Sequence, residues 1–301
     1  MRRLDTIDIR LLRVFVALAD AGGFAEAQVA LNLSQPTLST HLADLEKRLG
    51  GRLCQRGRQS FRLTDLGQAT YEAAIRLFGD LDDFSRRVAA ARGGLSGRLR
   101  IGVSDGTATS ATLGIHHALA RFLSPDRDVM VDLTLGTPAE LEAQLAGGSR
   151  DVVVGPLPRR TPGLETRFFA DEPHGLYCGA GHPLFAREDA GISRREIAGT
   201  AFSLRRYRHF DDLQLAGHPR PGALVVDMEA QLMLLLSGRF IGFLPCHLAA
   251  ADVAAGRLRA IRPDLFSFAS PHFVGWRRET ETNALVEAFV AELLATAPAA
   301  G

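Results

Sequence analysis

The sequence predicts an α+β protein of several domains: a small helical domain at the N-terminus, one long helix, and a C-terminal α/β region of two lobes. Three observations support this class. Helical hydrophobic patterns fill the first 92 residues, glycines interrupt the pattern from Gly93, and strands alternate with helices beyond that point. The chain has 301 residues, 46% of them hydrophobic, so it is long enough for more than one core.

Charge and hydropathy exclude several classes of protein. The formal net charge is only +1, which excludes a uniform polycation, yet the stretch from Lys47 to Arg62 carries six basic residues and no acid. No apolar run approaches the roughly 20 residues that a membrane-spanning helix needs, and the N-terminus lacks the pattern of a secretion signal. We expect a cytoplasmic protein without a membrane partner, whose basic stretch meets an electrostatic partner locally.

The three cysteines predict buried thiols in a reducing compartment. Cys54, Cys178 and Cys246 form neither a CxxC pair nor a zinc spacing. Cys178 with His182 as nucleophile and base, or Cys178 with Cys246 as a redox switch, are alternatives without a supporting local motif. Since no metal triad, phosphate loop or nucleophile motif is present, we expect no catalytic residue, metal or cofactor, and hence no enzyme.

The first 50 residues predict three helices. The first carries an apolar stripe from Ile9 to Ala19 and stops at Gly22-Gly23, and the second is short, at about residues 24–31. The third opens with Ser34 as its N-cap and has a proline in its first turn, where the missing N–H costs nothing. Helix, short helix, tight connection and helix is the order of a helix-turn-helix.

The third helix combines an apolar face with a polar N-terminal end. Its predicted core face comprises Leu38, Leu42, Leu45 and Leu49. Its first two turns carry side chains suited to base edges and phosphate oxygens, namely Ser34, Gln35, Pro36, Thr37, Ser39, Thr40 and His41. Glutamine is suited to bidentate contact with adenine. We expect this end to enter a groove of double-stranded DNA, although any isolated helix would favour a merely solvated polar face.

Two short alternating segments after this helix predict a hairpin. They are residues 53–55 and 61–63, on either side of Arg56-Gly57-Arg58. A hairpin beside a helix-turn-helix is a wing, and arginines at its tip would neutralise phosphate without reading sequence. We expect Arg56 and Arg58 to contact the DNA backbone.

Thr64 begins a long helical pattern that runs to about Arg92. Its apolar residues recur at near-heptad spacing from Leu66 to Val88, while the other face is charged. A dimerisation helix is therefore favoured over one that packs on its own C-terminal domain. The expected domains are residues 1–64 for DNA binding, 65–92 as linker and dimerisation helix, and 93–301.

The C-terminal region predicts two lobes and a cleft. Strands at residues 99–103, 129–135 and 152–154 alternate with helices at 109–122 and 138–145, which implies a parallel sheet. The chain then departs at about residue 164 and returns to a strand at 272–276 and a helix at 283–294. The expected lobe I comprises residues 97–163 and 268–297, and lobe II comprises 164–267.

Ser104 and Thr137 follow two of the predicted parallel strands, at the sheet edge where ligands bind. Thr137-Pro138-Ala139-Glu140 is a capping box, so its helix start presents N–H groups able to hold an anion. The alternative is that both hydroxyl groups only cap helices.

The chain resembles the LysR-type transcriptional regulators along essentially its whole length. The residues that carry the resemblance are Phe15, Ala27, Leu31, Ser34-Gln35-Pro36, Ser39, Leu45-Glu46, Leu49-Gly50, Leu53, Arg56, Leu63-Thr64 and Gly67, together with residues 179–184 and 238–245 of the C-terminal half. Thr40 and His41 depart from the family's commoner basic residue and glutamine, which affects base preference. Phe240 stands where glycine is usual, which affects the shape of the cleft.

The resemblance implies a winged helix-turn-helix domain and a periplasmic-binding-protein-like effector domain. It implies a homodimer or homotetramer that binds promoter DNA and responds to a small co-inducer, a carboxylate or an aromatic metabolite, in the interlobe cleft. Family positions that match Ser104 and Thr137 contact the effector. Phe202 and Ser203 lie near the positions through which lobe II contacts it. Side chains that could add positive charge for a carboxylate, or lie on the surface, are Arg205, Arg206 and His209. A solute-binding protein with an appended oligomerisation segment is the alternative class.

Overall fold

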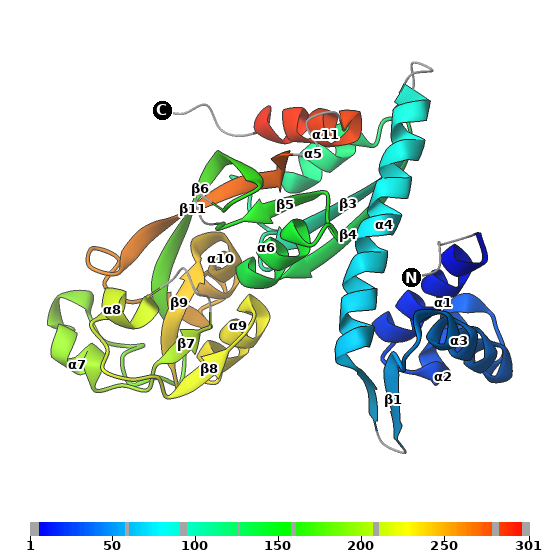
Figure 1. The fold of residues 1–301 in the computed structure, drawn as a ribbon. Coiled ribbons are helices and arrows are strands. Elements are labelled where there is room, and N and C mark those ends of the chain that lie inside the picture. The colour runs from blue at the N-terminus through cyan, green and yellow to red at the C-terminus, as the bar shows by residue number, and fades with distance from the viewer. Residues whose placement is uncertain are drawn as a thin grey trace. The chain divides into compact units, whose positions relative to one another are not determined.

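A computed structural model describes residues 6–57, 60–90, 95–125, 127–157, 161–206, 211–278 and 283–296 (Figure 1). The chain divides into two compact units, which are described separately. Unit 1 comprises Met1–Phe84 with Gly147–Ser149, and unit 2 comprises Ser85–Ala146 and Arg150–Gly301. Most of the long helix therefore belongs to unit 1, whereas the sequence predicts it as a separate linker.

Unit 1 has the order helix, short helix, helix, hairpin and long helix. Its elements are α1 (Thr6–Asp20), α2 (Phe24–Leu31), α3 (Gln35–Leu49), β1 (Cys54–Gly57), β2 (Ser60–Leu63) and α4 (Asp65–Ala90). The side-chain oxygen of Ser34 accepts a hydrogen bond from the N–H of Thr37 at 3.4 Å, so Ser34 is the N-cap of α3. The predicted helix-turn-helix and hairpin are confirmed.

The core of unit 1 lies between α1 and α3. Leu38, Leu42 and Leu45 are buried there against α1 residues such as Phe15. The prediction that Leu49 belongs to this face is wrong, because this side chain is 36% exposed in the last turn before Gly50 ends the helix. Three leucines are enough to hold α3 by one face and leave its other face to solvent.

The backbone of Leu53 connects α3, the β1–β2 hairpin, which is the predicted wing, and the long helix α4. Its N–H donates to Oε1 of Glu46 at 2.9 Å, and its carbonyl accepts from the N–H of Thr64 at 3.0 Å. The hydroxyl of Thr64 donates to the carbonyl of Arg52 and accepts from the N–H of Gly67. We call Glu46, Leu53, Thr64 and Gly67 the Leu53 junction.

Lobe I of unit 2 is a sheet covered by helices on both faces. Its elements are β3 (Ser96–Ser104), α5 (Ile115–Phe122), β4 (Asp128–Gly136), α6 (Pro138–Ala146), β5 (Val152–Gly155) and α11 (Ala284–Leu294). Successive side chains of β5 face opposite sides: Val152 and Val154 pack with α5 and α11, and Val153 packs with α6. The predicted helix over 109–122 is shorter than expected, because it begins only at Ile115, after Gly114 at φ 50°.

Lobe II contains the remaining short elements. They are η1 (Asp189–Gly191), α7 (Arg194–Ala198), β7 (Ser203–Arg205), α8 (Asp212–Ala216), β8 (Ala223–Val225), α9 (Met228–Leu236), β9 (Ile241–Pro245), α10 (Cys246–Ala254) and β10 (Leu258–Ala260). Two long strands, β6 (Leu164–Gly179) and β11 (Ser267–Arg277), run through both lobes.

The seven-stranded sheet of unit 2 has the order β10-β6-β11-β5-β3-β4, with β9 also on β6. Strands β3, β4 and β5 are parallel as predicted, while β6 and β11 pair antiparallel and their register shifts between His272 and Phe273. The prediction of crossing segments between two lobes is confirmed in the form of this strand pair (Figure 1). In the described part of the chain, no helix combines the length and apolarity needed to span a bilayer.

The Leu53 junction generates a stability prediction. A Cβ atom at Gly67 would lie 1.9 Å from the carbonyl oxygen of Leu53, so Gly67→Ala must displace the backbone that positions the wing. We expect the variant to lower the unfolding free energy of unit 1 by about 3 kcal/mol, measured by thermal unfolding in circular dichroism. Gly23→Ala is the matched control, because the nearest atom to its Cβ is the carboxylate of Glu26 at 3.6 Å. Equal stability of the two variants would contradict the prediction.

Candidate nucleic-acid interface and ligand cleft

The first turn of α3 presents polar groups to solvent. Ser34, Gln35 and Pro36 are exposed, and Thr37 and Ser39 are half-buried. The hydroxyl groups of Ser34 and Thr37 lie 2.8 Å apart and serve the cap. Gln35 has no hydrogen-bond partner among the described residues, so its amide is available to donate and to accept.

The polar side chains in the second turn of α3 are less available for contacts outside the protein than the sequence predicts. The hydroxyl of Thr40 is exposed but donates to the carbonyl of Pro36 at 3.0 Å. His41 is half-buried, and its Nδ1 atom is buried without a partner in the described part of the chain. Thr40 can therefore offer its methyl group and a lone pair to a ligand, and His41 lies closer to the core than predicted.

The wing carries its basic residues on a two-stranded hairpin. Arg56 lies in β1 opposite Phe61, and Gln55 lies opposite Arg62. Arg58 lies outside the described residues. The side chains of Arg52 and Arg62 are exposed, as is that of Lys47 at the end of α3.

One member of the basic stretch has a structural role instead. Nη1 of Arg48 lies 2.8 Å from Oδ1 of Asp8, whose side chain is buried in α1. This pair holds the C-terminal half of α3 to α1. The charge of Arg48 is therefore paired within the protein, and its partner, 40 residues away in the chain, gives no local signal.

A cavity of about 580 Å³ opens between the two lobes of unit 2. From lobe I it is lined by Asp105, Gly106, Leu135, Gly136, Thr137 and Glu140. From lobe II it is lined by Val226, Asp227, Met228, Glu229, Leu232 and Leu248. Its volume lies in the range of roughly 300–1,000 Å³ typical of small-molecule sites. The predicted cleft is therefore present, and Thr137 lies in its wall.

Ser104 lies next to this wall. It ends β3, pairs in register with Gly136 and precedes Asp105, two residues that line the cavity. The side chain is buried, and its hydroxyl has no hydrogen-bond partner among the described residues. A buried hydroxyl without a partner is costly, so this group is positioned to bind water or a ligand atom. The capping alternative is not observed for Ser104, but Thr137 does cap α6.

Phe202 and Ser203 do not line the cavity. Phe202 is completely buried in the core of lobe II, with its ring 5.1 Å from that of His218 and 6.3 Å from that of Phe243. The hydroxyl of Ser203 donates to Oε1 of Gln231. Because both side chains are occupied in the interior, their predicted contact with an effector finds no support in this arrangement.

Arg205 is also internal to lobe II. Its guanidinium is buried and makes two hydrogen bonds of 2.7 Å with the carboxylate of Asp212. Neither predicted alternative, a ligand-binding or a surface arginine, describes it. Arg206 is exposed, and His209 lies outside the described residues.

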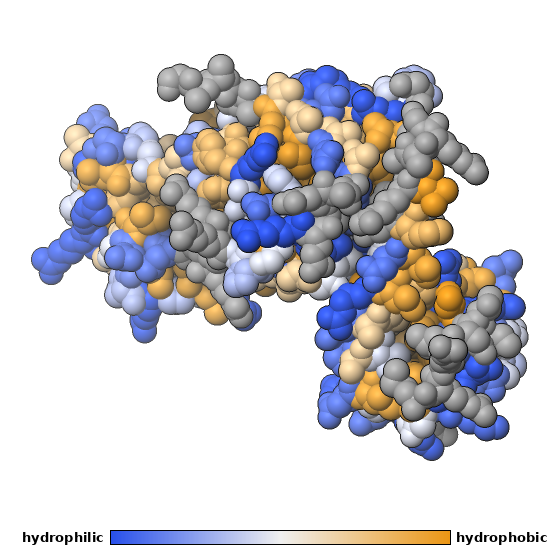
Figure 2. Space-filling view, turned by 45° about the horizontal axis from the view of Figure 1, so that its top comes forward, coloured by the Kyte–Doolittle hydropathy of each residue, from blue (hydrophilic) through white to orange (hydrophobic). Residues whose placement is uncertain are grey.

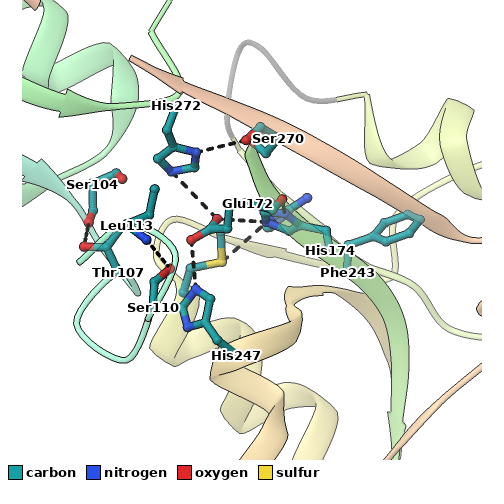
Figure 3. A network of polar contacts seen from close by, with 12 residues as sticks. Ser104, Thr107, Ser110, Leu113, Glu172, His174, Phe243, His247, Ser270 and His272 are labelled. Carbon is teal, nitrogen blue, oxygen red and sulfur yellow. Dashed lines mark hydrogen bonds and ion pairs between the residues drawn. The ribbon is translucent and has the colours of Figure 1, made fainter. Parts of the chain in front are cut away.

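A polar cluster at the crossing strands is not predicted by the sequence (Figure 3). Glu172 of β6 is 3% exposed, and its Oε1 lies 2.9 Å from Nε2 of His247 in α10. Nδ1 of His247 lies 2.9 Å from the hydroxyl of Thr109 in lobe I. His174 and His272 flank the same carboxylate at 3.5 and 3.7 Å. The cluster thus ties both lobes to the crossing strands.

The pKa values in this cluster are set by burial and by neighbouring charge. Burial raises the pKa of Glu172, but the hydrogen bond from His247 and the three imidazole neighbours outweigh it, so the net pKa is lowered. Burial, followed by the positive charge of Arg205, lowers the pKa of His174 to about 3. At neutral pH the cluster therefore holds a carboxylate beside a neutral His174.

The environment of Cys178 does not favour a reactive thiol. Cys178 is fully buried, and burial raises the pKa of its thiol to about 11. The Nδ1 atom of His182 accepts from the N–H of Leu184 at 3.2 Å, and burial lowers its pKa. The nucleophile–base alternative therefore finds no support, and no group of metal-ligand side chains is found among the described residues.

Two family models match the chain. Residues 9–68 match that of the bacterial regulatory helix-turn-helix protein, lysR family, and residues 92–298 match that of the LysR substrate binding domain. These matches assign DNA binding to unit 1 and effector binding to unit 2. They also disfavour a solute-binding protein with an appended oligomerisation segment, because the N-terminal match is to a DNA-binding domain.

Individual relatives cover almost the whole chain. The HTH-type transcriptional activator BauR of Pseudomonas aeruginosa is 37% identical over 290 residues, which cover 96% of this chain and 95% of that protein. The SDS degradation transcriptional activation protein of a Pseudomonas species is 33% identical over 270 residues, covering 86% and 87%. The crystal structure of full-length CbnR complexed with its target DNA has a TM-score of 0.66 at 24% identity, covering 96% and 99%, which shows a shared fold.

The buried histidine generates a pH prediction. The folded pKa of His174, about 3, lies below its ordinary value of 6.5, so the unfolded chain binds the proton first as the pH falls. Stability of unit 2 should thus decrease below pH 6.5, with His174 contributing about 2 kcal/mol of loss by pH 5. In His174→Gln, the unfolding free energy of unit 2 should depend less steeply on pH over this range. Unfolding at each pH is monitored by the fluorescence of Trp276, the single tryptophan of the chain. The exposed His117→Gln should keep the original slope; a His174→Gln slope equal to it would refute the assignment.

Proposed function

Because the chain belongs to the LysR family of transcriptional regulators, we propose that α3 and the wing bind promoter DNA while the interlobe cavity of unit 2 holds the small-molecule effector. One observation supports this above all: the exposed first turn of α3, with the unpaired amide of Gln35, is attached through the Leu53 junction to a wing that carries exposed arginine. A helix of this kind enters the major groove, and the wing meets the phosphate backbone beside it.

The polar end of α3 has a separate role for each side chain. Gln35 is the candidate for base reading, because its amide can donate and accept in one plane. Ser34, Thr37 and Ser39 are candidates for phosphate contacts, since each carries a hydroxyl group in the first turns of α3. Pro36, Thr40 and His41 would shape the contact surface, and Arg56 and Arg58 would bind phosphate.

Oligomerisation is a property of the family, and α4 offers a surface for it. Hydrophobic residues lie on the surface of this helix (Figure 2). Among them, Leu66, Phe84 and Val88 are 41, 66 and 44% exposed. Exposed apolar residues on one helix are typical of a surface that contacts a partner, and the sequence of α4 repeats its apolar residues at near-heptad spacing. We propose α4 as the dimerisation helix, with residues 1–64 as the DNA-binding domain.

The effector would act by shifting the balance between conformations of the oligomer. A ligand that prefers one arrangement of the lobes changes DNA binding by that difference in affinity. Thr137 and Ser104 are the residues we assign to the effector. We further propose activation of transcription as the outcome, because the two relatives named above are described as activators. Action on promoter DNA places the protein in the cytoplasm, and we expect no catalytic activity.

The wing assignment predicts a uniform loss of affinity. In Arg56→Ala, binding to all DNA sequences should weaken, and the slope of log affinity against log salt should fall by roughly 0.9 for each wing that binds. Gel-shift titrations at several salt concentrations measure this slope. Arg206→Ala, at an exposed arginine of lobe II, is the control. An unchanged slope in Arg56→Ala would exclude the wing from phosphate binding.

The base-reading assignment predicts a different pattern. Gln35→Ala should lose discrimination at one base step, worth about 1–3 kcal/mol, and leave the salt dependence unchanged. Selection of duplexes from a random pool by the original protein and by the variant measures the preference at each step. Gln214→Ala, at an exposed glutamine of α8, is the control. Identical selected sequences for Gln35→Ala and the original protein would contradict base reading by Gln35.

A further inference from the structure

We propose that the effector carries a positive charge: an organic cation, a primary amine or guanidinium on an apolar body, bound in the interlobe cavity. This inference rests on the proposed function, since it takes the cavity as the effector site. It differs from the expectation of a carboxylate or aromatic effector that the sequence suggests.

The charge of the cavity wall is the first argument. Four carboxylates line the cavity, Asp105 and Glu140 from lobe I and Asp227 and Glu229 from lobe II, and no lysine, arginine or histidine is among its lining residues. A cation in this space is attracted from both lobes, whereas an anion is repelled from both. Because the low-dielectric protein lies on several sides, these interactions are stronger than they would be at an open surface.

The two helix starts at the cavity are the second argument. Helix N-termini attract anions through their free N–H groups, and α6 and α9 both begin at this wall. The start of α6 is occupied, because Oε2 of Glu140 accepts from the N–H of Thr137 at 2.9 Å and from its hydroxyl at 2.8 Å.

The start of α9 is occupied in the same way. Asp227 accepts from the N–H of Ala230 at 2.7 Å, and Asp105 of lobe I accepts from the N–H of Met228. The chain's own carboxylates thus take the positions that a ligand carboxylate would need. A ligand anion would meet four like charges, and the N–H groups of Thr137, Met228 and Ala230 are already paired with carboxylates.

The remaining wall defines the body of the ligand. Leu135 and Val226 are 63 and 47% exposed, and Leu232, Leu248 and Met228 complete an apolar surface in the same cavity. A cation with an apolar chain satisfies the carboxylates and the apolar wall together.

The geometry also gives the cation a means of regulation. Asp105 of lobe I accepts from the N–H of Met228 in lobe II, so the two lobes meet at this wall. A cation bound between carboxylates of both lobes attracts each of them, so it favours the arrangement in which the lobes are close together. Differential affinity of this kind is what an effector needs in order to shift a conformational equilibrium.

The test uses the full-length protein and defined probes. We expect butylamine, 1,4-diaminobutane or agmatine to raise the thermal unfolding temperature of unit 2, read by the fluorescence of Trp276. Butyrate and succinate at matched ionic strength should not raise it. Magnesium chloride, tested alone, should not reproduce the effect of the amines.

Two variants remove charge while they keep the fold. Glu229→Gln alters an exposed side chain in the first turn of α9, and Asp227→Asn keeps a residue that is an equally good N-cap. Each should weaken amine binding about tenfold, as expected for loss of one charge-assisted contact. Glu287→Gln, at an exposed glutamate in the first turn of α11, is the matched control and should leave binding unchanged.

The outcomes separate this inference from the proposed function. Stabilisation by the carboxylates, no stabilisation by any of the three amines, equal stabilisation by magnesium alone, or amine binding unaffected by both variants would overturn the cation assignment. Gel-shift titration of the same protein tests DNA binding independently. If any of these results is found while DNA binding is intact, the cationic effector is rejected and the assignment as a DNA-binding regulator stands. If the original protein does not bind DNA, the proposed function itself is rejected.

Discussion

The arrangement of unit 1 depends on the backbone of Leu53. Its N–H is held by the carboxylate of Glu46 at the end of α3, and its carbonyl is held by Thr64 at the start of α4. Gly67 leaves room for this carbonyl, because any Cβ there would collide with it. These contacts fix the wing relative to α3, the two elements that carry the groups proposed to read bases and to bind phosphate. Buried backbone groups rarely remain unpaired, and here their pairing determines how α3, the wing and α4 are joined.

Much of unit 1 is predictable from local sequence because its signals are local. Ser34 caps α3 through an N–H three residues away, and the leucines of that helix repeat at helical spacing. The hairpin follows from two short alternating segments around Arg56-Gly57-Arg58. What the sequence does not predict depends on distant partners. Arg48 is bound to Asp8, and no spacing rule connects residues 40 positions apart.

The same distinction applies to unit 2. The parallel strands, the capping box at Thr137 and the cleft follow from patterns of a few residues, and the structure contains all three. The pairing of Arg205 with Asp212 and the grouping of Glu172 with His247 require the folded chain. The charge of the cavity is an intermediate case: Glu140 is recognisable in the sequence as part of a capping box, but only the fold brings it to the same wall as Asp227, the N-cap of α9. The carboxylates that cap these two helices are thus the ones that we propose select the ligand.

The central claim, that the first turn of α3 enters duplex DNA, is tested most directly by site-specific photo-cross-linking. A photoreactive amino acid at position 35, the first residue of α3, and another at position 287, in the first turn of α11, would be compared on the full-length protein. The DNA would be a duplex that the protein enriches from a random pool. The account predicts a cross-link from position 35 to bases within the enriched sequence and none from position 287. Cross-links from position 287 alone, or equal yields from both, would contradict it.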